Sequence, residues 1–409
     1  MKILFVLECT ALMTNGTTAS CIRFAEELNK RGHEVTCIGC ELKGKDKPTE
    51  HYAEFKNYNF PIFQSLIEKE GFQFIKVDNV KLYELIKETD CVHFFLSFKL
   101  ASNAYLIARS LNKPVTGAFH LQPDSITSAI HMNCKFLTSI IYKSFRRYLY
   151  KKVQYIHCPS KMIEKELRRQ NYKSELRVIS NGITPFWHKV DAEKEFKDKF
   201  VVTMVGRLAD EKSQDTLIKA IKYTKHEKDI KLVLCGQGPN QTKYEKLIKK
   251  QKFTNEALIR FMNQEDLRKF LSTVDLYCHC SKAEIEGLSC VEAFSCGAVP
   301  VISNSKLSAT SQFALCDESI YKKGNYKDLA KKIDYWFENK DKLKEYSLKY
   351  QELSKEYALD KQVDKFIQFF NDAISNYKPY KLSNKDKRKI KHIYKILIKN
   401  NIVKEMPIL

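Results

Sequence analysis

Two glutamates, Glu284 and Glu292, stand eight positions apart in the segment EIEGLSCVE. Gly287 lies between them, and the residues around the second glutamate have a helical pattern. Carboxylates accept hydrogen bonds from hydroxyl groups, and backbone N–H groups at the start of a helix bind anions. The segment therefore suits a ligand that carries both hydroxyls and phosphate.

Two cations follow an apolar run earlier in this half of the chain. Residues 200–205 read as a buried strand, Gly206 and Arg207 come next, and Lys212 stands five positions after the arginine. Two cations that converge on a diphosphate stabilise the charge of a leaving group without a metal ion. A second glycine turn, at Gly236, follows the next strand-like run.

The first half of the chain offers a glycine and a histidine. Gly16 stands between the first strand-like run and a helical stretch, where a glycine lets the backbone approach a phosphate. His120 follows the apolar run 115–119 directly, at the end of a strand where α/β domains bind ligands. An ordinary turn and a structural histidine are the alternative interpretations of these two residues.

The elements that position these residues alternate between short β-rich runs and longer amphipathic stretches, as in doubly wound α/β domains. The first series of predicted strands is 2–7, 34–38, 72–75, 91–96, 115–119 and 155–159, with helices at 19–31 and 103–111 among them. The second series is 200–205, 231–235, 258–261, 276–279 and 299–303.

Domain boundaries follow from a polar, charged stretch between the two series, which begins after Pro185. We expect an N-terminal domain over 1–185, a linker over 186–199 and a C-terminal domain over 200–359. A helix over 360–377 follows and is expected to cross back to the first domain. A basic tail occupies 378–409.

Together these segments resemble the motifs of the retaining glycosyltransferases of family 4. The two spaced glutamates are similar to the E-x7-E motif of that family, and the Gly206-Arg207 pair with Lys212 is similar to its diphosphate motif. The resemblance implies the GT-B fold, an α/β architecture of two Rossmann-like domains that face each other across a cleft. Residues 119–123, Phe-His-Leu-Gln-Pro, are similar to members that glucosylate membrane lipids.

The resemblance also implies roles for the individual residues. Arg207 and Lys212 would hold the nucleotide diphosphate, Glu284 and His120 would face the transferred sugar, and Glu292 would accept hydrogen bonds from the ribose. The remaining donor-binding positions supply backbone, and they are Gly16, Gly206, Gly236, Gly287, Leu288 and Ser289. Glu286 also lies in the segment, but only Glu284 has the required spacing to Glu292.

The reaction implied is transfer of a hexose from a nucleoside-diphosphate sugar, UDP-linked, with retention of the anomeric configuration. The acceptor expected is a membrane-associated lipid or a cell-envelope glycan, and neither a metal nor another cofactor is expected. Two alternatives remain, namely a nucleotide-sugar epimerase of the same fold and a non-catalytic adaptor bound to a membrane.

Charge and composition limit the classes of partner that the protein can have. Lys and Arg total 70 against 49 Asp and Glu, a formal charge of +21, which favours anionic partners. The excess is spread along the chain without a nucleic-acid module, so we expect no nucleic-acid partner. The thirteen cysteines are scattered and odd in number, so we expect free thiols rather than disulfides.

Two basic amphipathic segments, 125–152 and 381–399, have the composition of helices that lie on an anionic membrane. The alternative for each is a helix whose apolar face packs on its own protein. The apolar run at the start of the chain is too short for a signal peptide, and no apolar run in the sequence reaches the length of a membrane span. We therefore expect a cytoplasmic protein, peripheral at the inner face of the cell membrane.

Overall fold

The computed structural model describes residues 1–8, 16–42, 44, 46–60, 64, 73–124, 127 and 134–409. These residues form two compact units. The first contains residues 1–159, 163–179 and 363–409, and the second contains 160–162 and 180–362. The second unit thus begins before the expected boundary at residue 185. Residues 186–199, expected as a linker, belong to it.

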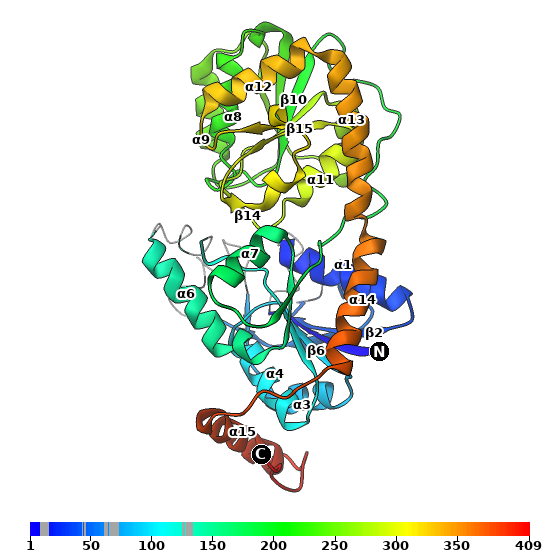
Figure 1. Ribbon diagram of the computed structural model, residues 1–409, viewed down its shortest axis with the longest axis vertical. Helices are drawn as coiled ribbons and strands as arrows, with labels where there is room; N and C mark the ends of the chain where they lie inside the picture. The colour runs from blue at the N-terminus through cyan, green and yellow to red at the C-terminus, as the bar shows by residue number, and fades with distance from the viewer. Residues whose placement is uncertain are drawn as a thin grey trace. The chain divides into compact units, whose positions relative to one another are not determined.

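The first unit contains a seven-stranded parallel sheet with the order β3-β2-β1-β6-β7-β8-β9 (Figure 1). Its strands are β1 (Lys2–Val6), β2 (Glu34–Cys40), β3 (Tyr52–Phe55), β6 (Cys91–Phe94), β7 (Val115–Ala118), β8 (Tyr155–Cys158) and β9 (Glu175–Val178). Its helices are α1 (Gly16–Lys30), α3 (Asn79–Lys87), α4 (Lys99–Ser110), α6 (Lys135–Tyr148), α7 (Lys161–Arg169) and α15 (Asn384–Lys399). The helix α14 (Leu359–Ser375) begins in the second unit and belongs to the first from Val363 on.

The second unit contains a six-stranded parallel sheet with the order β12-β11-β10-β13-β15-β17. Its strands are β10 (Phe200–Val205), β11 (Ile230–Cys235), β12 (Leu258–Arg260), β13 (Leu276–His279), β15 (Val299–Ser303) and β17 (Ile320–Tyr321). Its helices are α8 (Gln214–Tyr223), α9 (Gln241–Gln251), α10 (Gln264–Thr273), α11 (Leu288–Ser295), α12 (Tyr326–Glu338) and α13 (Lys340–Ser354). A separate short pair joins β14 (Ala283–Glu284) to β16 (Leu307–Ser308).

The central strands were predictable because both of their faces are buried. All residues of β6, β7, β13 and β15 are buried, as expected for strands of a parallel sheet covered on both faces. The structure confirms β10, β13 and β15 with the predicted bounds. Three strands of the two main sheets were not predicted, namely β3, β9 and β17, each at the edge of its sheet.

One predicted strand, 72–75, is placed differently. Residue 72 lies outside the described residues, and Phe74–Ile75 forms β5, which pairs antiparallel with β4 (Asn57–Tyr58) in a separate two-stranded ladder. The run is apolar enough for a strand, but it is only two residues long in the structure. It therefore does not join the main sheet, as the prediction assumed.

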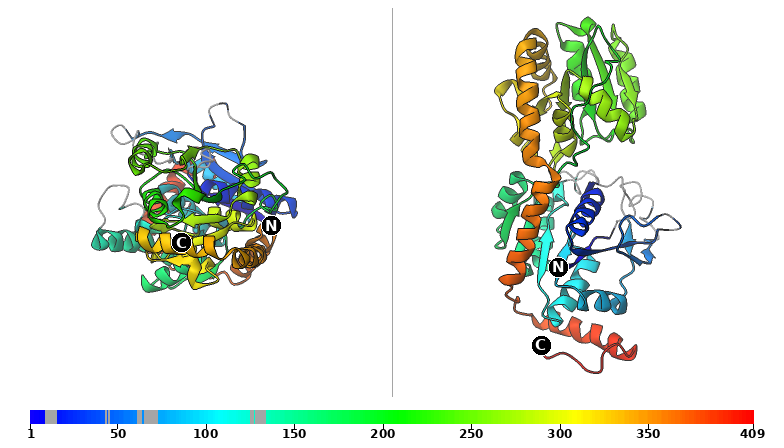
Figure 2. Two further views of the ribbon diagram at one scale, coloured as in Figure 1. Left: turned by 90° about the horizontal axis from the view of Figure 1, so that it is seen from above. Right: turned by 90° about the vertical axis from the view of Figure 1, so that its right-hand side faces the viewer.

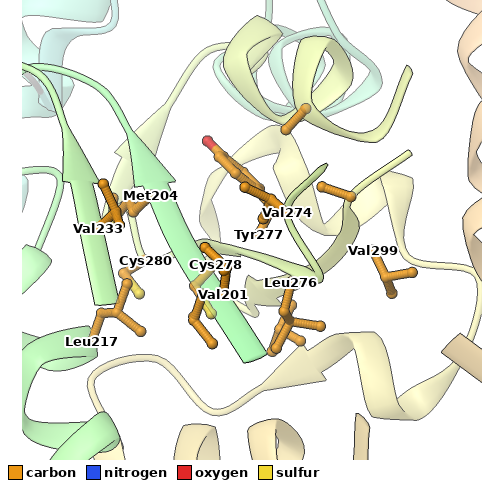
Figure 3. Packing of buried hydrophobic residues seen from close by; sticks show 14 of the residues in the cluster. Val201, Met204, Leu217, Val233, Val274, Leu276, Tyr277, Cys278, Cys280 and Val299 are labelled. Atoms are coloured by element: carbon orange, nitrogen blue, oxygen red, sulfur yellow. The ribbon is translucent and has the colours of Figure 1, made fainter. Parts of the chain in front are cut away.

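The core of the second unit lies between its sheet and helices, and Figure 3 shows a part of it. Side chains of β10, β11 and β13 meet α8 there, and the labelled ones include Val201, Val233, Cys278 and Leu217. Each of these four is at most 1% exposed. The cysteine is one of the twelve described cysteines, all of which are free thiols and most of which are buried.

The last two helices complete the first unit. Phe366 of α14 packs with ring centroids 4.7 Å from Phe24 of α1 and 5.2 Å from His93 of β6. Beyond it, α15 lies against α3 and α4 in both views (Figures 1 and 2). Its apolar side chains are buried there: Ile390, Ile393, Tyr394 and Leu397. The apolar face of the basic tail is therefore covered by its own protein.

The strand order places functional residues at one edge of each sheet. In the first unit the order reverses between β1 and β6, and in the second between β10 and β13. Ligands of such sheets bind beyond the carboxyl ends of the strands at this reversal. In the second unit these ends are Val205, followed by Gly206, and His279.

Candidate functional site

Two glycine turns shape the carboxyl edge of the second unit. The N–H of Gly206 donates to Cys235 O at 2.9 Å, and Leu208 N donates to Gln237 O at 3.1 Å, so the loops after β10 and β11 run together. A Cβ on Gly236 would lie 2.0 Å from Gly206 O. Because no side chain fits there, the predicted glycines bring two loop backbones together at the strand ends.

Gly287 begins the helix α11. It has φ +89°, in the left-handed region, and a Cβ there would lie 2.2 Å from Thr310 Cγ2. Leu288 and Ser289 form the first turn, whose N–H groups have no acceptor within a helix. The sharp turn therefore presents a helix N-terminus directly after Glu284, an arrangement that favours an anion.

Lys212 and Glu284, predicted from separate motifs, form an ion pair. Their side chains are 19% and 20% exposed. The neighbouring residues are also linked, because Lys282 N donates to Glu211 O at 2.7 Å and so holds the loop after β10 against the segment before Glu284. Burial opposes ionisation, but the ammonium of Lys212 and the nearby His279 outweigh it and lower the pKa of Glu284 to about 2. The site therefore holds a carboxylate that stays charged.

Two buried residues that were not among the predicted site residues, His279 and Tyr277, lie beside Glu284. His279 Nε2 is 3.6 Å from Glu284 Oε2, and its Nδ1 is 3.1 Å from the Tyr277 hydroxyl, which is also 3.1 Å from Ser289 Oγ. Burial lowers the pKa of His279, although Glu284 opposes the shift. A signal was present, because His279 ends a buried strand just as His120 follows one.

The remaining predicted residues of this edge are Arg207 and Glu292. Arg207 Nη2 donates to Glu211 at 2.8 Å, its side chain is 43% exposed, and its carbonyl accepts from Gln214 Nε2 at 2.8 Å. Glu292 is half-buried on α11. Burial is the main cause of the raised pKa of Tyr277, followed by Cys290, and the charges of Glu284 and Glu292 add smaller contributions.

Glu286, the other acid of the segment, has a structural role. It is 3% exposed and accepts hydrogen bonds from the Ser180 hydroxyl, from Asn181 N at 3.1 Å and from Asn181 Nδ2 at 2.7 Å. These contacts tie the start of the second unit to the segment before α11. The two neighbouring acids, Glu284 and Glu286, therefore point to different partners.

His120 and Gly16 belong to the first unit, whereas the other predicted site residues belong to the second. His120 is 5% exposed, and burial together with His157, 5.2 Å away between ring centroids, keeps its pKa well below the usual value. Within the described part of the chain, its Nε2 has no hydrogen-bond partner. Gly16 begins α1, and a Cβ there would meet nothing within 4 Å. Residues 9–15, which precede it, lie outside the described residues.

The described ranges contain no cluster of three His, Cys, Asp or Glu side chains that could hold a metal ion. None of their helices is both long enough and apolar enough to cross a membrane.

The chain matches known families and is similar to known proteins. Residues 14–185 match the family described as Glycosyltransferase Family 4, and residues 186–369 match Glycosyl transferases group 1. Alpha-monoglucosyldiacylglycerol synthase of Acholeplasma laidlawii is 25% identical over 328 residues, which cover 74% of this chain and 80% of that protein.

Two solved structures are also similar. HepE of Anabaena, solved in complex with UDP, has a TM-score of 0.73 at 16% identity and covers 91% of this chain and 100% of its own. The catalytic domain of cholesterol-alpha-glucosyltransferase from Helicobacter pylori is 41% identical, covers 39% of this chain and 99% of its own, and has a TM-score of 0.36. With two parallel-sheet units, Glu284 paired with Lys212 and family matches over residues 14–369, this chain belongs to the family 4 glycosyltransferases of the GT-B fold.

Proposed function

We propose that this glycosyltransferase takes a hexose from a UDP-sugar bound to its second unit and transfers it, with retention, to a membrane-associated lipid or envelope glycan. The observation that carries the proposal is the ion pair of Lys212 and Glu284 beside the first turn of α11. A cation and helix N–H groups suit a diphosphate, and a carboxylate suits sugar hydroxyls.

The donor would be divided among these groups. Arg207 and Lys212 would contact the diphosphate, because the guanidinium of Arg207 is partly exposed and its present partner, Glu211, is a surface carboxylate. The backbone of Gly287, Leu288 and Ser289 would meet the same phosphates. Glu284 would accept from the sugar hydroxyls and Glu292 from the ribose.

In this scheme the bond between the anomeric carbon and the diphosphate oxygen breaks while the acceptor oxygen bonds to the same face of the sugar. The acceptor proton goes to the departing phosphate. Arg207 and Lys212 stabilise the negative charge that grows on the diphosphate, a role that cations perform without a metal. No cofactor is proposed.

The comparisons support the classes of donor and acceptor. The Acholeplasma relative is named as a synthase of a glucosylated diacylglycerol. We propose a membrane lipid of this class as the acceptor of this chain. HepE was solved with UDP, so a protein with this fold holds the proposed nucleotide. Residues 119–123 also favour a lipid acceptor, because this segment is similar to the corresponding segment of glycosyltransferases that glucosylate membrane lipids.

A thermal-shift panel of UDP-, GDP- and ADP-sugars tests the donor. We expect stabilisation by a UDP-sugar alone, about 2.7 kcal/mol at one hundred times its dissociation constant. The shift should vanish in Arg207→Ala and persist in Lys243→Ala, a control that removes an exposed cation paired with Asp210 of the same loop. A wild-type protein that no nucleotide sugar stabilises would contradict the proposal.

Analysis of the product and of its rate of formation tests retention of the anomeric configuration and independence of a metal. Proton NMR of the product formed first from an α-linked donor should show an α-linked hexose. The rate should be unchanged in EDTA. A β-linked product would exclude retention, and activity lost in EDTA and restored by a divalent cation would exclude metal independence.

A further inference from the structure

The first unit contains a strongly basic pocket that takes no part in the site described above. The pocket has a volume of about 630 Å³ and lies between α4, the end of α6 and the start of α15. Six basic side chains line it: Arg147, Lys151, Lys152, Lys381, Lys385 and Lys389.

Its one lining carboxylate, Asp386, is already neutralised. Asp386 Oδ1 accepts from Lys152 Nζ at 2.7 Å, and the two side chains are 9% and 11% exposed. Its other oxygen accepts from the Ser383 hydroxyl at 2.8 Å in the capping box that begins α15. The charge of the pocket therefore comes from the other five cations. They are exposed, and none of them has an ion-pair partner among the described residues.

The pocket is built by long-range contacts. Arg109 Nε donates to Tyr380 O at 3.1 Å, and the hydroxyls of Ser110 and Tyr394 are 3.0 Å apart. Together with the Lys152–Asp386 pair, these contacts hold the start of α15 against α4 and the end of α6. Five like charges held on one concave surface repel one another, and an anion relieves that repulsion.

The exposed face of α6 next to the pocket indicates where the anion comes from. Phe136, Ile140, Lys143 and Arg147 are spaced by four, three and four residues, so they share one face of the helix. Phe136 is 74% exposed and Ile140 is 44% exposed. Apolar side chains beside a cluster of cations suit a membrane surface, where the apolar groups enter the interface and the cations meet phosphates.

We propose that this pocket binds the phosphate headgroups of anionic lipids and so holds the first unit on a membrane surface. The α6 face, defined as Phe136, Ile140, Lys143 and Arg147, adds its two apolar side chains to the lipid interface. The inference deepens the proposed membrane-associated acceptor, but it rests on residues separate from the donor site.

Sedimentation with vesicles tests the pocket. The full-length protein is mixed with vesicles of equal parts phosphatidylglycerol and phosphatidylcholine, and with vesicles of phosphatidylcholine alone. The pocket variant carries Lys381→Glu, Lys385→Glu and Lys389→Glu. The control carries Lys391→Glu, Lys395→Glu and Lys399→Glu, which change the same charge on exposed residues of α15 that do not line the pocket.

We expect the wild type to bind only the anionic vesicles. Each cation near an anionic surface contributes about a factor of five, so the pocket variant should bind at least about tenfold more weakly while the control loses less than about threefold. Inorganic pyrophosphate shares the phosphate chemistry of a headgroup, so at equal ionic strength it should weaken the binding of the wild type more than sodium chloride does, and it should have no such extra effect on the pocket variant.

Two results would overturn the proposal: no binding of the wild type to the anionic vesicles, which would leave a soluble phosphate as the ligand, or an equal loss in both variants. The UDP-sugar thermal shift, measured on all three proteins, should be equal. A missing shift beside intact vesicle binding contradicts the donor proposal alone, and the reverse result contradicts the pocket alone.

Discussion

The ammonium of Lys212 and the carboxylate of Glu284 form an ion pair across 72 positions of the chain, and this pair joins the loop after β10 to the strand before α11. One partner comes from each of two motifs that the sequence suggested separately. Because the pair is about four-fifths buried, removal of either partner leaves a charge that water solvates poorly.

The first prediction concerns this pair. Lys212→Met should lower the free energy of unfolding by roughly 1–3 kcal/mol, less than for a fully buried pair because part of each side chain is exposed. Adding Glu284→Gln should recover part of the loss, since no uncompensated carboxylate remains. Denaturant unfolding of the two single variants and the double variant measures the coupling. Additive losses would show that the two side chains do not interact.

The same pair should depend on pH in a defined direction. The pKa of Glu284 lies below its ordinary 4.5, so the pair stabilises the folded protein above pH 4.5, and this stabilisation is lost as the pH falls toward about 2. The stability difference between wild type and Glu284→Gln should therefore shrink across that window. A difference that stays constant down to pH 2 would argue against the lowered pKa.

A second prediction separates the two neighbouring acids. Glu286→Gln should lower the free energy of unfolding by about 1–3 kcal/mol, because both carboxylate oxygens accept hydrogen bonds and the amide NH2 group that replaces one of them would face a donor. Its kcat at low temperature should stay within about threefold of wild type, given that its partners are structural. Glu284→Gln should lower kcat by more than about tenfold, and it should also lower stability because it leaves Lys212 without its partner. The kcat therefore distinguishes the two residues. Reversed effects would exchange the roles given to the two residues.

A third prediction tests the turn before α11. In Gly287→Ala, the alanine must adopt a left-handed φ, and its Cβ would lie 2.2 Å from the Thr310 methyl. The free energy of unfolding should therefore fall by about 2 kcal/mol or more. Adding Thr310→Ser removes that methyl and should recover the steric part only. Gly16→Ala is the matched control, since a Cβ there meets nothing within 4 Å. Equal unfolding midpoints for the two alanine variants would contradict the assigned strain.

A fourth prediction concerns Glu8, which follows β1 and is 4% exposed. Burial raises its pKa from 4.5 to about 7, although a hydrogen bond from Leu100 N, 3.2 Å away, opposes the shift. Between these values the folded state binds more protons than the unfolded state, so stability should fall as the pH rises, by at most about 3 kcal/mol from this group. Glu8→Gln should lack that fall. Parallel pH profiles of unfolding for the two proteins would contradict the raised pKa.

Much of this protein follows from local patterns. Apolar runs such as 200–205 and 276–279 predict central strands because a parallel sheet buries both faces of its strands. Gly236 and Gly287 mark turns that a side chain would obstruct, and Gly206 has a φ of +149° that favours glycine, so all three turns are visible in the sequence as a choice of glycine. The order of these strands and turns was enough to suggest the family, which the comparisons then confirmed.

The remaining features depend on contacts between residues distant in sequence, and only the tertiary structure decided them. His279 and Tyr277 join the site because β13 lies next to β10, where the strand order reverses. Glu286 is structural because Ser180 and Asn181, more than one hundred positions away, donate to it. The basic tail admitted two interpretations because amphipathic spacing shows that a helix has an apolar face without showing what covers it. Packing against α3 and α4 covers that face, and it leaves the cations of α15 to complete a pocket with the end of α6.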